Sequence, residues 1–325
     1  MNPPVKVALS NTRFAILALV VGAVLALGCQ FIQNDYFFNA AYTVLLYAIL
    51  STAWNILGGY TGYVNFGTAA FFAIGVYSSI VLYKAFHLPL GLLIIAGTVV
   101  AGVAGIGLGY LTLRLRGHFF AIATLALAVM LFTFVTNWDY AGGARGAYVL
   151  VPREVPFGFP RYIRYLFTVM VGLTVLAIVV ARIIERSRFG QGLAAIRDDE
   201  LAAECAGVPT LRLKLIATAI SGGMMGLAGT TFPFFISFVE PVGAFDLRYA
   251  VNAIAMPVIG GMTTWLGPLL GAILLGTVQQ LVQVTISSAW NLLIVGVLLV
   301  GFVTLAPEGI MGWVLAWRAR RSKRS

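Results

Sequence analysis

Residues 88–113 read LPLGLLIIAGTVVAGVAGIGLGYLTL, 26 positions without one charged side chain. A helix rises about 1.5 Å per residue, so roughly 20 apolar residues cross the hydrocarbon core of a bilayer, which is ~30 Å thick. The stretch therefore predicts a transmembrane helix. Its small residues recur at spacings that let a second helix backbone approach closely. The glycines with this spacing are Gly102, Gly105, Gly107 and Gly109, and a second set follows at Gly222, Gly223, Gly226 and Gly229.

The composition of the whole chain agrees with this reading. Of 325 residues, 60% are hydrophobic and only 10% are charged, and the mean hydropathy is +0.96. Soluble domains are closer to half apolar and a quarter charged. A soluble enzyme, a disordered chain and a fibrous protein are therefore excluded. We expect an all-α, polytopic membrane bundle in which lipid surrounds most of the chain.

Ten apolar runs qualify as candidate spans. One of them, Tyr249–Met262, is short, and we expect it to bend at the Gly260-Gly261 pair. The others are Phe14–Phe31, Phe38–Leu57, Phe66–Tyr83, Leu88–Leu113, Phe119–Thr136, Ile163–Ile184, Leu213–Phe238, Trp265–Ile286 and Asn291–Leu305.

The distribution of basic residues supports ten crossings with both termini in the cytoplasm. This topology places fifteen Lys and Arg inside and six outside, as the positive-inside rule requires. Without the crossing at Tyr249–Met262, the basic C-terminal tail would face outward. The inner set is Lys6, Arg13, Arg114, Arg116, Arg182, Arg186, Arg188, Arg197, Arg212, Lys214, Arg318, Arg320, Arg321, Lys323 and Arg324. The outer set is Lys84, Arg145, Arg153, Arg161, Arg164 and Arg248.

The net charge of +10 does not indicate nucleic-acid binding, because the basic residues stand at the ends of apolar runs rather than in one stripe. The basic tail suits the anionic head groups of membrane lipid. Cys29 and Cys205 fall on opposite sides of the membrane in this topology, so both are expected to be free thiols. His87 and His118 are far apart, and the chain has neither HExxH nor CxxC, so we expect no metal site and no cofactor.

Every Asp and Glu lies in a loop or near the end of a span, which argues against a proton-coupled carrier. The chain has no GxxxxGK[ST] motif, so ATP, if it drives this protein, must bind to another chain. No set of residues suggests an enzyme. A passive channel, a sodium-coupled carrier and a membrane scaffold stay open as alternatives to an ATP-driven permease.

Residues 185–212 form the most polar stretch and are expected in the cytoplasm. An Ala-rich helix is predicted over Gln191–Ala206, and Gly207 followed by Pro209 is typical of a helix stop. Leu193, Ile196 and Leu201 are expected to share one face beside an acidic cluster. A helix on the bilayer would favour basic residues, so this acidic one favours a protein partner. The residues expected to couple to an ATPase are Arg197, Asp198, Asp199, Glu200, Leu201, Glu204 and Gly207.

Five stretches together resemble the M-type permease subunits of bacterial branched-chain amino acid ABC transporters. The match in order and spacing extends from about residue 40 to 312. The chain departs from the usual family pattern at Asn65–Thr68 and at Met262 and Trp265. The five stretches are Gly58–Phe72, Leu113–Ala126, Ser187–Pro209, Gly260–Ala272 and Pro307–Gly312.

The resemblance implies an ABC importer permease: one transmembrane domain over residues 1–325, with a cytoplasmic coupling loop at 185–212 and a periplasmic loop at 137–162. It implies three kinds of protein partner, namely two cytoplasmic ATPases, a homologous second permease and a periplasmic substrate-binding protein, and membrane lipid is the further partner expected from the composition and the basic tail. The protein would be located in the bacterial inner membrane, which its chain would cross many times.

The implied activity is translocation of branched-chain or related small neutral amino acids by alternating access. The exact solute stays open among leucine, isoleucine, valine, other amino acids, amides and urea. The exposed turn expected to dock the binding protein holds Gly142, Gly143 and Arg145. The neutral polar residues expected to line the pathway are Asn55, Asn65, Asn252, Gln279 and Gln283.

Overall fold

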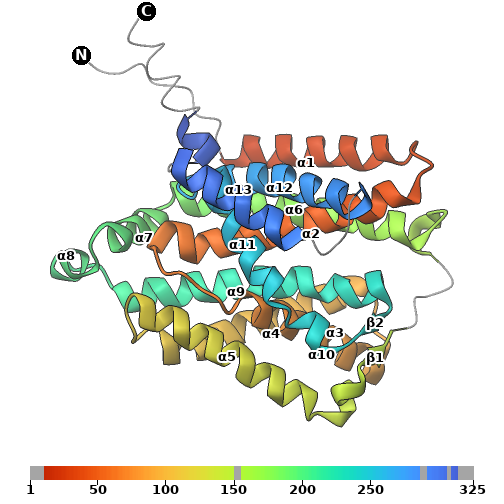
Figure 1. Ribbon diagram of the computed structural model, residues 1–325, viewed down its shortest axis with the longest axis horizontal. Coiled ribbons are helices and arrows are strands. Elements are labelled where there is room, and N and C mark those ends of the chain that lie inside the picture. The colour runs from red at the N-terminus through yellow and green to blue at the C-terminus, as the bar shows by residue number, and fades with distance from the viewer. Residues whose placement is uncertain (1–10, 150–154, 286–290, 306–308, 314–325) are drawn as a thin grey trace, which may run out of the picture.

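The protein is described by a computed structural model that covers residues 11–149, 155–285, 291–305 and 309–313. It is a bundle of long helices that run between its two ends, some in the same direction as a neighbour and some in the opposite direction (Figure 1). The predicted all-α membrane bundle is confirmed. Nine helices of the described chain are long and apolar enough to cross a membrane, and Leu293–Phe302 is a shorter apolar helix. The basic residues Lys6, Arg153, Arg318, Arg320, Arg321, Lys323 and Arg324 lie outside the described residues, as do Ile286, Pro307 and Glu308.

The first half of the chain supplies five membrane-length helices in succession. They are α1 (Asn11–Cys29), α2 (Asp35–Thr61), α3 (Thr68–Phe86), α4 (Leu90–Thr112) and α5 (His118–Thr136). Short elements follow on one end of the bundle: η1 (Asp139–Ala141), η2 (Gly143–Arg145), β1 (Ala147–Tyr148) and η3 (Pro156–Gly158).

The second half begins with α6 (Tyr162–Arg186) and the two short helices α7 (Arg188–Asp198) and α8 (Glu200–Cys205). The remaining elements are α9 (Thr210–Ile236), β2 (Phe238–Val239), α10 (Pro241–Ala244), α11 (Leu247–Gly260), α12 (Gly267–Thr285) and α13 (Asn291–Leu305).

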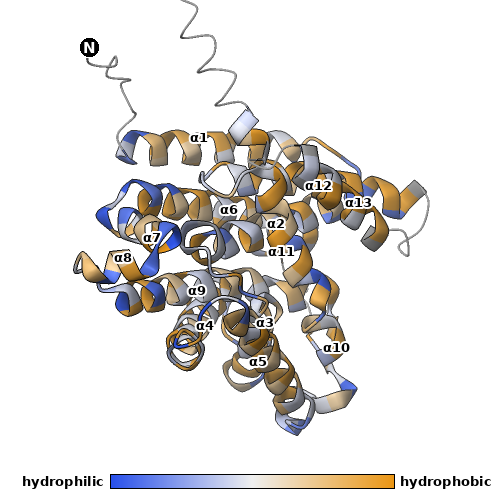
Figure 2. Cartoon of the chain, turned by 60° about the vertical axis from the view of Figure 1, so that its left-hand side comes forward, coloured by the Kyte–Doolittle hydropathy of each residue, from blue (hydrophilic) through white to orange (hydrophobic). Residues whose placement is uncertain are grey.

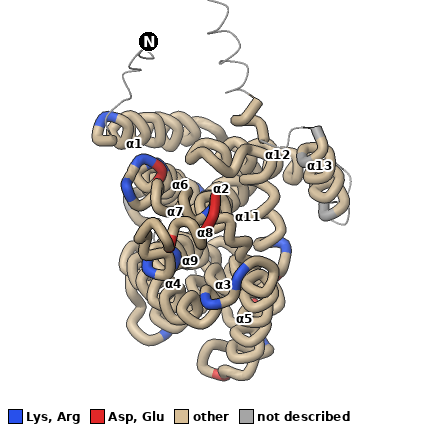
Figure 3. The backbone as a smooth tube through the Cα atoms, turned by 90° about the vertical axis from the view of Figure 1, so that its left-hand side faces the viewer, with Lys and Arg blue, Asp and Glu red and all other residues tan. Residues whose placement is uncertain are grey.

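The two ends of the bundle differ in character. We call the end that carries α7 and α8 the inner end, because the positive-inside rule predicts that it faces the cytoplasm, and the opposite one the outer end. The first turn of α1 and the last turn of α13 both lie at the inner end (Figure 1). Hydrophilic residues gather there on α7 and α8 (Figure 2), and a view onto this end shows Lys and Arg around the few acidic residues (Figure 3).

Helices α2 and α9 form the centre of the bundle. In their most apolar windows, 67% of α2 and 78% of α9 is buried, against 17% for α1 and α5. Helix α9 packs on α4, α3 and α2, while α2 also contacts α6, α11 and α12. The apolar surfaces of α1, α4 and α5 therefore remain for lipid or another membrane chain.

Glycine explains how closely the central helices pack. A Cβ at Gly105 of α4 would lie 2.9 Å from the Thr218 carbonyl oxygen of α9, and one at Gly226 would lie 2.2 Å from Ala101 Cβ. Backbones this close leave no room for side chains, so these predicted packing glycines are confirmed as contact points. Gly107 is different, because it has open space around it.

The short span near residue 250 also has a physical explanation. Helix α11 has 14 residues, but with α10 it makes a 20-residue apolar segment, Pro241–Gly260, that is long enough to cross. The predicted bend at Gly260-Gly261 is instead the end of the helix. A Cβ at Gly260 would lie 1.8 Å from the Gly267 carbonyl oxygen, so the glycines allow the start of α12 to pack against this end.

Candidate functional site

The inner end holds a helical pair rather than one helix. The predicted single helix over Gln191–Ala206 is wrong, because the chain is extended at Asp199 between α7 and α8. The Asp199 side chain accepts a hydrogen bond from the backbone N–H of Ala202 at 3.0 Å, which caps α8. Aspartate competes with helix continuation by bonding to nearby backbone groups, so it favours a new start at this point.

The break changes which residues share a face. Leu193 and Ile196 of α7 are buried, but Leu201 of α8 is 60% exposed. The predicted common apolar face is therefore wrong, and Ala203 is the residue of α8 that packs inward. Leu201 instead forms an exposed apolar spot at the inner end, next to the exposed residues Asp198 and Asp199.

A charged network connects α8 to the membrane helices. Lys214 Nζ, at the start of α9, donates to Glu200 Oε1 at 2.6 Å and to the Tyr63 hydroxyl oxygen at 3.1 Å. The Tyr63 hydroxyl donates to Glu200 Oε2 at 2.5 Å. Lys214 is 2% exposed, so its charge depends on these partners. Glu200 thus joins α8 to α9 and to the loop between α2 and α3.

The environment of Glu200 favours its charged form. Partial burial opposes ionisation, but the hydrogen bonds from Lys214 and Tyr63 and the positive charges of Lys214 and Arg116 outweigh it. The pKa of Glu200 consequently lies below its usual range. Burial and the hydrogen bond to Glu200 raise the pKa of Tyr63, which keeps its hydroxyl protonated as a donor.

Two further contacts extend the network. Arg116, in the loop between α4 and α5, lies 3.4 Å from Glu204 Oε1 and 4.0 Å from Glu200 Oε1. The Thr210 hydroxyl, at the start of α9, donates to Glu204 at 2.8 Å. Sequence reasoning missed Lys214, Tyr63 and Arg116. The available signal was Lys214, a cation inside the predicted span Leu213–Phe238, since buried lysines require partners.

Arg197 and Gly207 complete the description of the coupling candidates. Arg197 Nη1 donates to the Gly59 carbonyl oxygen at 3.5 Å, near the carboxyl end of α2, where positive charge is favourable. Gly207 has φ of +83°, as expected for a residue that stops a helix in the left-handed conformation.

Three of the five predicted pathway residues line one polar cavity. Asn252 of α11 and Gln279 and Gln283 of α12 surround a space of about 190 Å³, together with Thr43 and Tyr47 of α2. Gln279 Nε2 donates to Asn252 Oδ1 at 2.7 Å, and both residues are buried. The Tyr36 hydroxyl, near the start of α2, donates to the neighbouring Gln280 carbonyl oxygen, so the cavity lies in the outer half of the bundle.

The other two pathway candidates lie elsewhere. Asn65 Oδ1 accepts from the N–H of Gly67 at 2.7 Å in the turn before α3. Asn55 is 1% exposed and lies against Gly59 of its own helix. Neither residue lines the polar cavity.

The cavity also contains an ion pair that sequence reasoning did not select. Arg248 Nε donates to Asp246 Oδ2 at 2.8 Å, and Asp246 Oδ1 accepts from the backbone N–H of Arg248, capping α11. Both residues line the same space as Asn252. Because both stand in a loop or at a helix start, their position in the sequence gave no sign of a cavity.

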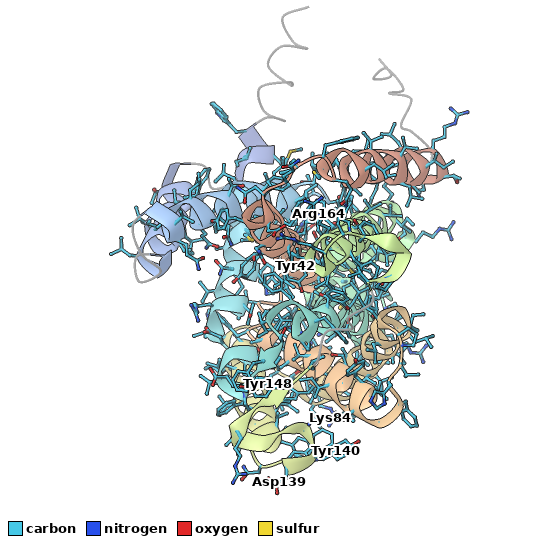
Figure 4. All side chains as sticks on the ribbon, turned by 90° about the vertical axis from the view of Figure 1, so that its right-hand side faces the viewer. Tyr42, Lys84, Asp139, Tyr140, Tyr148 and Arg164 are labelled. Carbon is cyan, nitrogen blue, oxygen red and sulfur yellow. The ribbon has the colours of Figure 1, made fainter. Side chains whose placement is uncertain are left out.

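The outer end carries the predicted docking turn (Figure 4). Gly142 and Gly143 have φ of +104° and +54°, and Arg145 is exposed. The expected exposed turn is only partly correct, because Gly143 is buried against the last turn of α5. The chain that follows the turn is fixed by the antiparallel pairing of β1 with β2, in which Ala147 pairs with Val239.

These features define a multi-pass α-helical membrane protein with a charged network at one end and a polar cavity toward the other. Its family follows from comparison with known proteins. The chain belongs to the family of permease components of branched-chain amino acid transport systems, whose model matches residues 36–303.

Individual relatives agree with the family. The chain is 29% identical to the high-affinity branched-chain amino acid transport system permease protein LivM of Escherichia coli K12, over 91% of this chain and 74% of that protein. It is 24% identical to a probable branched-chain amino acid transport permease protein LivH of Methanocaldococcus jannaschii, over 78% and 84% of the two chains. It is also 32% identical to the autoinducer 2 import system permease protein LsrC of Salmonella typhi, over 46% of this chain and 44% of that protein. No solved structure matches the chain.

Proposed function

We propose that this chain is the permease subunit of an ATP-driven ABC importer in the bacterial inner membrane, moving branched-chain or related small neutral amino acids by alternating access. In this proposal the described bundle is one permease domain that pairs with a homologous second permease. Two cytoplasmic ATPases supply energy and a periplasmic binding protein delivers the solute. The family and the LivM relatives support the proposal.

The observation that carries the ATP-driven mechanism is the network around Glu200. It joins α8 to three places in the membrane bundle: Tyr63 after α2, Arg116 after α4 and Lys214 in α9. A force applied to α8 would therefore reach several spans together. A passive channel would not need this connection between an exposed cytoplasmic segment and the spans.

The coupling residues divide by their contacts into two roles. Asp198 and Leu201 face outward and would contact an ATPase. Arg197, Glu200 and Glu204 face the bundle and would hold the helical pair to the spans. Asp199 and Gly207 delimit α8 by capping its two ends.

The cavity around Asn252 is the part of the pathway that the geometry favours. Neutral amides offer donors and acceptors to a small polar solute without trapping it by a strong charge. Asn55 and Asn65 are less favoured, since the cavity does not include them. At the outer end, Arg145 projects from a turn fixed by Gly142 and Gly143 and would meet an acidic rim of the binding protein.

The test of coupling uses exposed residues only. We expect Leu201→Asp with Asp198→Lys to abolish co-purification of the ATPases and amino acid uptake at normal expression. Glu200 is unsuitable here because reversing its charge would leave the buried Lys214 without its acidic partner. The matched control is Phe86→Asp, which alters an exposed apolar residue at the outer end.

Two results would contradict the proposal. Retained ATPase binding together with normal uptake in the double variant would remove α8 from coupling. Uptake by the purified chain alone, without ATPases, would favour a channel or a sodium-coupled carrier.

A further inference from the structure

The polar cavity is lined by a pair of opposite charges in addition to its neutral amide side chains. At its outer rim, Arg248 and Asp246 place opposite charges side by side, with Arg248 Nη2 2.6 Å from Asp246 Oδ2. A guanidinium has five N–H donors, so contact through Nε and Nη2 leaves further donors for a carboxylate. The Asp246 carboxylate likewise has more acceptor positions than these contacts use.

The rest of the cavity suits the other parts of a small amino acid. The Gln279–Asn252 pair, 4% and 6% exposed, forms a neutral, hydrogen-bonded floor. Tyr47, Tyr249 and Val295 add aromatic and apolar surface beside the charged rim. The cavity lining therefore combines a pair of opposite charges with aromatic and apolar surface.

We infer that the Asp246–Arg248 pair recognises the two charges of a zwitterionic amino acid in this cavity, with Arg248 contacting the carboxylate and Asp246 the ammonium group. The inference rests on the proposed function, in which this cavity belongs to the solute pathway. It also distinguishes between solutes. Urea and amides carry neither charge, so they gain no ion pairs here, whereas an α-amino acid gains both.

The pair suits transient binding as well. It is already neutral as a whole, so a zwitterion enters without adding net charge to the membrane. Arg248 is largely exposed, with 66% of its side chain accessible, and exposed ion pairs are weak. A solute held this way is selected by charge and still released.

The variants are chosen to remove a charge from the pair without disturbing the structure of α11. Asp246→Asn removes the charge and keeps an N-cap acceptor for α11, because asparagine caps helices as well as aspartate does. Arg248→Gln removes the positive charge, and Arg248→Lys keeps it. The matched controls are Asp35→Asn and Arg161→Gln, since these two residues form another ion pair at the outer end that does not line the cavity.

The first measurement is leucine uptake by the complete reconstituted complex. We expect Asp246→Asn and Arg248→Gln to lower uptake about tenfold or more, the scale of one lost charge-assisted hydrogen bond, while Arg248→Lys retains most of it. The controls should stay near the wild type. Normal uptake by both charge-removing variants would overturn the inference and leave the proposed function intact. A wild-type complex that takes up no branched-chain or other small neutral amino acid would instead refute the proposed function.

The second measurement needs no binding protein. Millimolar leucine should raise the melting temperature of the complex, and leucinamide and 4-methylpentanoate, which each lack one charge, should not. Asp246→Asn and Arg248→Gln should remove the leucine effect without lowering the melting temperature of the ligand-free complex. Equal protection by leucine and leucinamide would overturn the assignment of Arg248 to the carboxylate.

Discussion

Lys214 Nζ lies 2.6 Å from Glu200 Oε1, and this contact joins the first turns of a membrane-spanning helix to a short helix outside the bundle. Both side chains are shielded, with 3% and 13% of their surfaces exposed. A buried pair of this kind makes little net contribution compared with apolar residues, but removing one partner is costly. The contact therefore matters more for geometry than for overall stability.

A double-mutant experiment tests that relationship. Lys214→Met alone leaves the Glu200 charge without its main partner and should destabilise the protein by about 3 kcal/mol or more. Adding Glu200→Met should recover much of that loss while uptake remains impaired, because the link between α8 and α9 is still absent. Thermal unfolding in nanodiscs measures the first effect and reconstituted uptake the second. Additive destabilisation in the double variant would contradict a direct interaction.

The Glu200 contact also predicts a dependence on pH. The pKa of Glu200 is lower in the folded protein than in the unfolded chain, so its stabilising effect is complete above the unfolded value of about 4.3. The effect is lost as pH falls through the folded pKa. Melting curves from pH 7 to pH 3 should show the wild type losing its advantage over Glu200→Gln only at the acidic end. A constant difference across that range would contradict the assignment.

Gly207 offers a test of how α8 ends. Its φ is +83°, and a Cβ added there would meet no atom within 4 Å, so any penalty comes from backbone conformation alone. Gly207→Ala should cost roughly 1 kcal/mol, and Gly207→Asn should cost less because asparagine tolerates the left-handed region. Hydrogen exchange of residues 200–207 provides the measurement. Exchange rates equal to those of the wild type in both variants would show that the left-handed conformation carries no penalty for a residue with a Cβ.

The membrane fold was predictable from sequence, because long apolar runs and charge asymmetry act over whole helices. The break at Asp199 was not predictable, because an Ala-rich stretch favours a continuous helix. A single capping contact, from the Ala202 N–H to the Asp199 side chain, starts a new helix instead. The partners of Glu200 were hidden for another reason. Tyr63, Arg116 and Lys214 come from three distant segments that only tertiary packing brings together.

In the candidate sites, too, the residue types were predictable from the sequence but their tertiary contacts were not. Asn252 and Gln279 were predicted as polar residues in spans, but the sequence does not show that they bond to each other beside Arg248. Trp265, which departs from the family pattern, has a side-chain contact that accounts for it, because its ring packs on Phe14 of α1. Its backbone N–H donates to Glu185 of α6 at 2.5 Å, so the segment before α12 is joined to both α1 and α6.

The two native cysteines test the orientation of the bundle. Both are free, as predicted; Cys205 of α8 is exposed at the inner end, and Cys29 ends α1 at the outer end. In a Cys29→Ala background, a membrane-impermeant maleimide should label Cys205 in inside-out vesicles and not in intact spheroplasts, because the positive-inside rule predicts a cytoplasmic α8. Ala144→Cys in the exposed outer turn, combined with Cys205→Ala in the same background, should give the opposite pattern. Labelling of both positions from the same side would refute the topology, and labelling of Cys205 only in spheroplasts would show that the bundle is inverted.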